Sequence, residues 1–271
     1  MSGTLIAFRW EARKLLSQKR TYIGIGAAAL LPTLFVVVMS LQTGGPYDAP
    51  LGHNLRKTGL SLALVVLTFA SRFGAQLVTA LVAGDIVAAE DSGGTLKTIL
   101  TRSLVRRQIL AGKTLAAFAY VIAVLMSLAV AGLIGGTIAW GFKPLTTFSG
   151  TRVSALHALG LTFAALGVFA LPLLGVAAFG IFLSVATRNS AASIVGSVVY
   201  AVAQEAVGGL VHVAWLKRYL LSTQFDAWQG VFHAPVDWTH VGRAAWVSLL
   251  YVAVPLAAAQ IIFRRRDVAG P

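Results

Sequence analysis

Long apolar stretches separated by short polar connections run along the whole chain. A helix that crosses the hydrocarbon core of a bilayer needs about 20 mostly apolar residues. Six segments contain such a stretch, and they cover residues 23–41, 60–89, 115–140, 156–185, 191–211 and 244–263. The pattern predicts an all-α, polytopic membrane protein with six transmembrane helices, forming a single domain over residues 1–271.

Two further segments are expected to lie at the membrane surface. Residues 1–20 place apolar side chains at helical spacing, with basic side chains between them, and therefore predict an amphipathic interfacial helix. Its predicted apolar face consists of Leu5, Phe8, Ala12, Leu15 and Leu16. Residues 212–243 predict short interfacial helices, because aromatic side chains settle at headgroup depth. The aromatic side chains in question are Trp215, Tyr219, Phe225, Trp228, Phe232 and Trp238.

Composition supports a membrane protein and excludes several other classes. Only 11% of the 271 residues are charged and 57% are hydrophobic, whereas a soluble domain has about 25% charged residues. A water-soluble globule and a nucleic-acid-binding arm are therefore excluded. The chain has no cysteine, which excludes disulfides and thiolate metal sites.

The net charge of +13 indicates how the chain is oriented. With both termini on the same side, 14 of the 22 Lys and Arg residues lie in segments on that side, and 7 lie on the other. Cytoplasmic segments of membrane proteins carry an excess of Lys and Arg. We therefore expect cytoplasmic N- and C-termini.

The connection after the second predicted span contains a second amphipathic element. Gly93 and Gly94 interrupt the helical pattern, and Thr95 is suited to cap a new helix. A short helix over about residues 95–102 would have one apolar face, formed by Leu96, Ile99 and Leu100, opposite Lys97, Thr98 and Arg102. Such a short helix is unstable alone in water, so we expect it to dock against a partner.

The run AAEDSGGTLKTILTRSLVRRQILAGKTLA resembles the segment between the second and third spans of type-2 permeases of ATP-binding-cassette (ABC) transporters. The similar positions are Glu90, Gly94, Thr95, Leu96, Leu100, Arg106 and Lys113. The N-terminal stretch FRWEARKLLSQKR and the run FLSVATRNSAASIV between spans four and five are also similar. One departure is Ser103-Leu104, where the family often has a proline soon after the amphipathic stretch.

The resemblance implies a non-catalytic permease subunit of an ABC transporter, and we expect an exporter. In that family the short helix is a coupling helix that sits in a cleft of a separate ATPase subunit. The residues expected to make this coupling are Glu90, Gly94, Thr95, Leu96, Ile99, Leu100, Arg102, Arg106 and Lys113. The implied partners are an ABC ATP-binding subunit, a second copy or homologous permease, and the lipid bilayer. The implied location is the cell membrane, which is the inner membrane in bacteria.

No cofactor is expected in this chain, since the partner subunit would bind the ATP. Gly112-Lys113-Thr114 resembles the end of a phosphate-binding loop, but Arg107 stands where the first glycine is required and no strand pattern precedes it. His233, Asp237 and His240 would share one face of a helix, but Pro235 argues against an undisturbed helix there. No metal site and no nucleic-acid partner are therefore expected.

Ionisable residues within apolar spans are functional candidates. They are Arg72 and Glu205, with Asp85 near the cytoplasmic end of the second span. Arg72 and Glu205 would form either a structural ion pair or a polar patch in the substrate path. An alternative function, an ion-coupled secondary transporter or channel, would use Arg72, Asp85 and Glu205. Gly132-x-x-x-Gly136 and Gly160-x-x-x-Ala164 would allow close contacts between helices.

Overall fold

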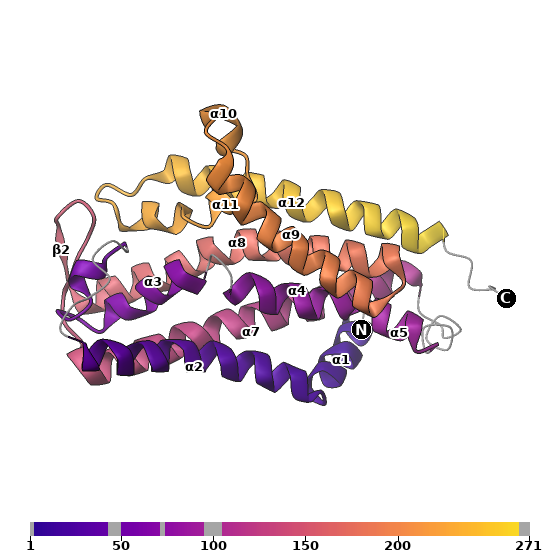
Figure 1. The fold of residues 1–271 in the computed structure, drawn as a ribbon, viewed down its shortest axis with the longest axis horizontal. Helices are drawn as coiled ribbons and strands as arrows, with labels where there is room; N and C mark the ends of the chain where they lie inside the picture. The colour runs from indigo at the N-terminus through magenta and orange to yellow at the C-terminus, as the bar shows by residue number, and fades with distance from the viewer. Residues whose placement is uncertain (1–2, 43–49, 71–73, 95–104, 266–271) are drawn as a thin grey trace.

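The computed structural model describes residues 3–42, 50–70, 74–94 and 105–265, and it confirms a helical protein built to cross a membrane several times (Figure 1). Within these ranges, 5 helices are long and apolar enough to span a bilayer. They are α2 (Lys19–Leu41), α7 (Arg106–Trp140), α8 (Ala155–Thr187), α9 (Ser190–Leu210) and α12 (Trp238–Arg265). Each of the five overlaps one of the predicted spans.

The second predicted span differs from the expectation of one helix over residues 60–89. The described part of this segment forms three helices: α3 (Leu60–Phe69), α4 (Ala75–Asp85) and α5 (Ala88–Ser92). A turn at Ile86 and Val87 separates α4 from α5. The chain then leaves α5 through Gly94, whose φ of 70° lies in the left-handed region that glycine tolerates. The predicted break at Gly93 and Gly94 is therefore confirmed.

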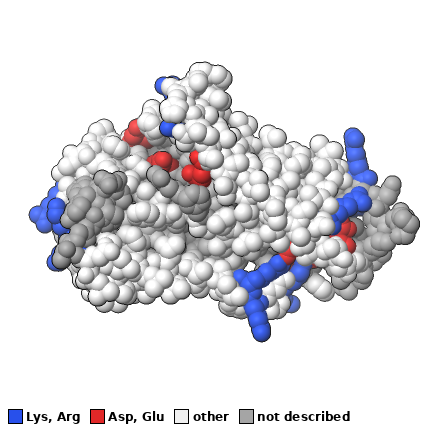
Figure 2. All heavy atoms as spheres, viewed as in Figure 1, with Lys and Arg blue, Asp and Glu red and all other residues white. Residues whose placement is uncertain are grey.

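The helices run roughly along the long axis of the molecule, with α8 in the middle (Figure 1). Helix α8 packs against α12, α4, α9 and α7. Most of its most apolar stretch is buried, whereas α2, α9 and α12 turn broad apolar faces outward. Lys and Arg side chains lie mainly toward the two ends, around α1 and beside α10, and much of the remaining surface is uncharged (Figure 2). This distribution suits a bundle whose flanks contact lipid.

The two ends of the bundle carry different elements. At one end lie α1 (Gly3–Leu16), α5, the turn from α8 to α9 and the end of α12, and we call it the α5 end. The opposite end carries η1 (Gly52–Asn54) and a small hairpin. In this hairpin β1 (Leu145–Thr146) pairs antiparallel with β2 (Arg152–Val153), and Leu145 lies opposite Val153. The described segments that were predicted to share a side with the termini thus share the α5 end, whereas α10 (Ala214–Lys217), from the segment 212–243 predicted for the other side, projects near the middle of the long axis (Figure 1).

One of the two small-residue motifs makes the predicted close contact between helices. A Cβ atom on Gly136 would lie 2.3 Å from the carbonyl oxygen of Gly59, and a Cβ on Gly132 would lie 3.1 Å from the Cα of Ala63. Helix α7 therefore meets the start of α3 backbone to backbone. Gly160 makes no such contact within the described part of this chain, where nothing lies within 4 Å of the position of its Cβ.

The segment 212–243 forms short helices as predicted, but half of its aromatic side chains are not at the surface. The helices are α10 (Ala214–Lys217), α11 (Leu221–Gln224) and η3 (Ala227–Phe232). Phe225, Trp228 and Phe232 are buried, whereas Trp215, Tyr219 and Trp238 are exposed. Because η3 packs on both α8 and α12, its aromatic rings fill the interior between these helices instead of facing headgroups.

Candidate functional site

Four charged side chains from three helices meet at the α5 end. The amine of Lys113 on α7 lies 2.8 Å from Glu11 Oε2 on α1 and 2.7 Å from Glu90 Oε2 on α5. The amine of Lys14, also on α1, lies 2.5 Å from Glu90 Oε1 and 3.2 Å from Glu11 Oε1. We call Glu11, Lys14, Glu90 and Lys113 the ion quartet.

The ion quartet is largely shielded from solvent. Glu11, Glu90 and Lys113 are only 6%, 5% and 2% exposed. Lys113 also donates a hydrogen bond to the carbonyl oxygen of Ile86, at the turn between α4 and α5. Two acids and two amines balance in charge, which makes burial of Glu11, Glu90 and Lys113 tolerable where burial of one charge alone would be costly. The quartet therefore ties α1, α5 and the α4–α5 turn to the start of α7.

A close approach between helices brings the quartet together. Gly112 precedes Lys113, and a Cβ atom there would lie 2.5 Å from the Cβ of Ala7 and 2.8 Å from the backbone nitrogen of Phe8. Only a residue without a side chain lets α1 cross α7 at this distance. Glu11 lies one turn after Ala7 and faces the same side, so it points at α7.

This crossing changes the face that α1 was expected to bury. The predicted helix is confirmed, with Leu15 buried and Phe8 and Ala12 half-buried. Leu5 and Leu16, which we also assigned to the buried face, are exposed, and Glu11 is buried in their place. The face is rotated because α1 packs on another helix through its charged side chains, and not on lipid alone.

The acids of the quartet control the charge of Lys14. Burial by itself lowers the pKa of this amine, but the charge of Glu11 and the hydrogen bond to Glu90 outweigh it and raise the pKa above 10.5. Lys14 therefore stays protonated at neutral pH and supplies the second positive charge.

A second polar contact at the α5 end centres on Asp85, the last residue of α4. Its carboxylate pairs with Arg20 at the start of α2 and accepts a hydrogen bond from the Ser190 hydroxyl at the start of α9. The Ser193 hydroxyl donates to the carbonyl oxygen of Gly84 at 2.5 Å. Asp85 is only 4% exposed, so this carboxylate at the cytoplasmic end of the predicted second span is buried and paired.

A serine of α8 holds the turn between α4 and α5. The buried Ser184 hydroxyl accepts hydrogen bonds from the backbone N–H groups of Val87 at 3.0 Å and Ala88 at 2.9 Å. These groups lie where α5 begins and where helical backbone donors lack partners within the helix. Ser184 belongs to the run FLSVATRNSAASIV, so the similarity noted there includes a residue that orients the neighbouring connection.

Ser184→Ala is expected to destabilise the protein by about 1–3 kcal/mol, because it leaves buried backbone donors without an acceptor. The measurement is the thermal midpoint Tm of the purified chain in detergent. Ser40→Ala is the matched control, since the exposed Ser40 hydroxyl bonds only Val36 O of its own helix. Equal Tm values for the two variants would contradict the role given to Ser184.

The structure brings together only part of the predicted coupling set. Glu90 and Lys113 meet in the ion quartet. Gly94, with its positive φ, follows the end of α5. Arg106, the first residue of α7, donates a hydrogen bond to the carbonyl oxygen of Arg264 at the end of α12. Five of the predicted residues lie outside the described ranges: Thr95, Leu96, Ile99, Leu100 and Arg102.

The intramembrane candidates do not form one site among the described residues. Glu205 on α9 accepts a hydrogen bond from the Gln76 amide on α4 at 2.7 Å. Asp85 has different partners, Arg20 and Ser190. Arg72 lies outside the described residues, so its pairing with Glu205 stays a prediction.

The His233, Asp237 and His240 group does not form a metal centre in the part of the chain that is described. No cluster of at least 3 possible metal ligands occurs there. Asp237 instead accepts hydrogen bonds from Thr239 and His240, which lower the pKa of its carboxyl below the usual 3.8. His233 turns away and stacks on Phe148, with ring centres 5.5 Å apart.

Sequence reasoning missed three charged residues of the α5 end: Glu11, Lys14 and Arg20. A usable signal was present for Glu11. It is the only acidic residue in the basic N-terminal stretch, and it lies four residues from both Ala7 and Leu15, on their face of the helix. An acid on the apolar face of a basic helix indicates a buried cationic partner.

Comparison with known families places the chain in a family of unknown function. A family model described as a protein of unknown function, DUF2705, matches residues 26–269. The matched range includes α5 and α7, with Glu90 and Lys113, and excludes α1, with Glu11 and Lys14. No curated protein matches the sequence.

Proposed function

We propose that this chain, which belongs to the family DUF2705, is the membrane-spanning permease subunit of an ABC exporter. A separate ATPase subunit supplies the energy, and two permeases, either two copies of this chain or one copy and a homologue, form the pathway between them. In this proposal α3 and α4 make the second of six spans. Both termini and the α5 end face the cytoplasm, and the protein lies in the cell membrane.

The ion quartet is the observation that carries this proposal. Residues 95–102, the proposed coupling helix, lie between α5 and α7 in the chain. The quartet fastens α5 to α7 and fastens α1 to both. A movement of a partner bound to this segment would therefore be transmitted to the membrane helices. The reason is that α5 and the start of α7, which flank the segment, cannot move independently of α4 and the rest of α7.

Charge on the cytoplasmic surface also supports a protein partner there. Exposed basic residues at the α5 end include Arg13, Arg107, Arg264 and Arg265. Basic side chains around an apolar helix complement a groove with an acidic rim, which steers and orients a docking subunit.

The geometry favours this function over an ion-coupled transporter or channel. An ion path through Asp85 and Glu205 would require these groups to communicate along the membrane. Asp85 is instead paired with Arg20 at the boundary of the bundle, and Glu205 is bonded to Gln76 on α4.

The docking of the coupling helix can be tested with a double variant. Leu96→Asp with Leu100→Asp is expected to abolish association with the ATPase subunit, because a charge would replace each of two apolar anchors at a buried interface. The full chain is purified with an affinity tag from its native membranes in mild detergent, and the co-purifying ATPase is quantified by mass and by ATP hydrolysis.

Thr98→Asp is the matched control, since Thr98 lies on the opposite face of the predicted helix. It should retain the ATPase. Absence of any ATPase in the wild-type preparation, or retention of the ATPase by the double variant, would overturn the proposed docking.

A further inference from the structure

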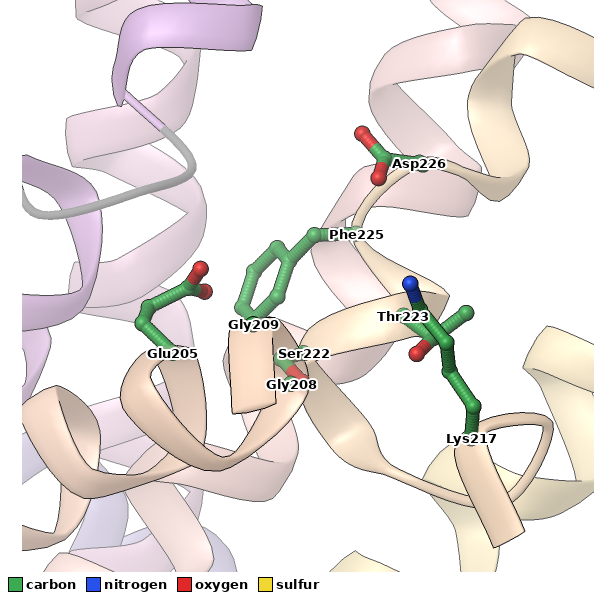
Figure 3. A pocket seen from close by; sticks show the side chains of 8 residues that line it. All are labelled: Glu205, Gly208, Gly209, Lys217, Ser222, Thr223, Phe225 and Asp226. Atoms are coloured by element: carbon green, nitrogen blue, oxygen red, sulfur yellow. The ribbon is translucent and has the colours of Figure 1, made fainter. Parts of the chain in front are cut away.

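A cavity of about 240 Å³ lies between η3, the residues around α10 and α11, and the start of α12. Two arginines line it: Arg218 directly follows α10, and Arg243 lies in the second turn of α12. Thr223 and Asp226 line this cavity and also a neighbouring one, into which Lys217 extends from α10 toward these two residues (Figure 3). Three basic side chains therefore come to this region from two helices.

The two guanidinium groups have no acceptor from the described part of the protein. Neither the Arg218 nor the Arg243 side chain takes part in an ion pair or a hydrogen bond there. Each guanidinium carries several N–H donors in a planar fork, and Arg243 is half-buried, so part of its surface is removed from water. A ligand that accepts hydrogen bonds from both groups would supply what the cavity lacks.

The acids of the lining have other partners and do not supply these acceptors. Asp237 accepts hydrogen bonds from the hydroxyl and the backbone N–H of Thr239, and from the backbone N–H of His240. Asp226 accepts a hydrogen bond from the Gln229 amide at 3.4 Å and has further partners. Because both carboxylates already accept hydrogen bonds, the two arginines are the groups of this cavity that a ligand would satisfy.

The backbone that carries each arginine is held in place by the protein itself. The Gln224 side chain is only 3% exposed. Its amide donates hydrogen bonds to the carbonyl oxygen of Arg218 at 2.9 Å and to that of Leu220 at 2.8 Å. Arg243 is fixed by its position within α12. A site that is ordered before its ligand arrives loses less conformational entropy on binding.

The cavity lies at the boundary of the bilayer that is opposite the α5 end. Helix α12 has 28 residues, or about 42 Å, whereas the hydrocarbon core is about 30 Å thick. Arg264 and Arg265 in its last turn lie at the α5 end, so the start of α12 reaches the head groups on the opposite side. The exposed rings of Tyr219 and Trp238, which adjoin lining residues, are typical of this depth.

We propose that this cavity binds a phosphate group, which the guanidinium groups of Arg218 and Arg243 hold. The planar fork of an arginine matches phosphate with two parallel hydrogen bonds, and basic pockets between membrane helices bind phosphorylated lipid head groups. The phosphate is that of a phospholipid or is free in solution, and the arms of the test distinguish these two sources. The inference does not rest on the proposed transport function.

The test is equilibrium binding to the purified full chain in a neutral detergent without added lipid. The two phosphate probes are radiolabelled inorganic phosphate and radiolabelled dioleoyl phosphatidylglycerol. Dioleoylglycerol, which has the same chains and no phosphate, is the comparator. A lipid site should bind phosphatidylglycerol saturably and about tenfold or more tightly than dioleoylglycerol, since hydrogen bonds between charged groups discriminate by that factor. A site for the free anion should bind inorganic phosphate saturably.

Variants locate the binding. Arg218→Gln together with Arg243→Gln should weaken binding of the phosphate probe about tenfold or more, because the charged hydrogen bonds from both sides are lost. The matched control is Lys143→Gln together with Arg152→Gln, which also removes two positive charges. Lys143 lies just before β1 and Arg152 lies on β2, and neither lines the cavity. The control pair should bind like the wild type.

The proposal is overturned if neither phosphate probe binds saturably, or if the arginine double variant binds like the wild type. Equal weakening by the control pair would also contradict it, because binding would then depend on net charge alone. Arg218 is exposed, so Arg218→Gln alone keeps the test available if the double variant fails to fold. The assay needs no ATPase subunit, and its failure would leave the proposed function standing.

Discussion

Lys113→Met is expected to lower the stability of the protein by about 3–5 kcal/mol, the cost of breaking a buried ion pair from one side. Lys113 is the most deeply buried member of the quartet and lies within 2.8 Å of both Glu11 and Glu90. Without its charge, two buried carboxylates share one amine, that of Lys14. The measurement is the Tm of the purified chain in detergent.

Lys14→Met is the control for this prediction, because it removes the other, less buried amine of the quartet. The Lys14 side chain is 35% exposed, against 3% for that of Lys113, so solvent screens its pairs and the loss should be smaller. If both variants lowered Tm equally, the burial argument would fail.

A compound variant separates the cost of unpaired charge from the value of the contact itself. Glu11→Met and Glu90→Met combined with Lys113→Met should recover most of the stability that Lys113→Met loses, since replacing a buried ion cluster by apolar side chains is often neutral. In the proposed complex with an ATPase subunit, this compound variant should hydrolyse ATP without transport, because the charges that fix the orientation of α1 are absent. Recovery of full transport would show that packing alone is sufficient.

Gly136→Ala is expected to destabilise the protein by about 1–3 kcal/mol, the usual cost of overpacking a tight contact. Its added Cβ would lie 2.3 Å from a carbonyl oxygen of Gly59 and 3.0 Å from the Cβ of Leu62. Gly59 is the N-cap residue of α3 and Leu62 lies in its first turn. One obstacle is backbone and the other is a Cβ atom, so rotation of a side chain cannot relieve the overlap. Helix α3 would have to move away from α7.

Gly160→Ala is the matched control for this prediction. The position is helical, and no other part of the described chain lies within 4 Å of its Cβ site. The variant should keep or slightly raise the Tm, because alanine favours helix over glycine. The measurement is the Tm in detergent together with the yield of membrane-inserted protein. A loss of Tm at Gly160 equal to that at Gly136 would contradict the close-contact argument.

Much of the helical layout was predictable from the sequence because the bilayer imposes it. The predicted span 115–140 ends at the same residue as α7, and 191–211 differs from α9 by one residue at each end. The span 60–89 failed as a single helix because its break at Ile86 and Val87 is held by the Ser184 hydroxyl from α8. No local pattern in the sequence reports a partner 97 residues away.

The ion quartet, too, was predictable from the sequence only in part. The sequence indicated Glu90 and Lys113 through their resemblance to a family pattern, but it did not indicate that they touch, or that Glu11 and Lys14 join them. Motif spacing was also ambiguous by itself. Gly132-x-x-x-Gly136 makes a close contact and Gly160-x-x-x-Ala164 does not, since a small residue permits approach only where another helix is present.

The sequence by itself determined that this protein is a helical bundle that crosses a membrane. Its apolar runs are long enough to span the hydrocarbon core, and backbone groups in lipid must form hydrogen bonds within helices. The tertiary structure decided which charges meet. Glu11 and Glu90 reach Lys113 only because Gly112 lets α1 cross α7, and buried charges are stable only where their partners lie within hydrogen-bond distance.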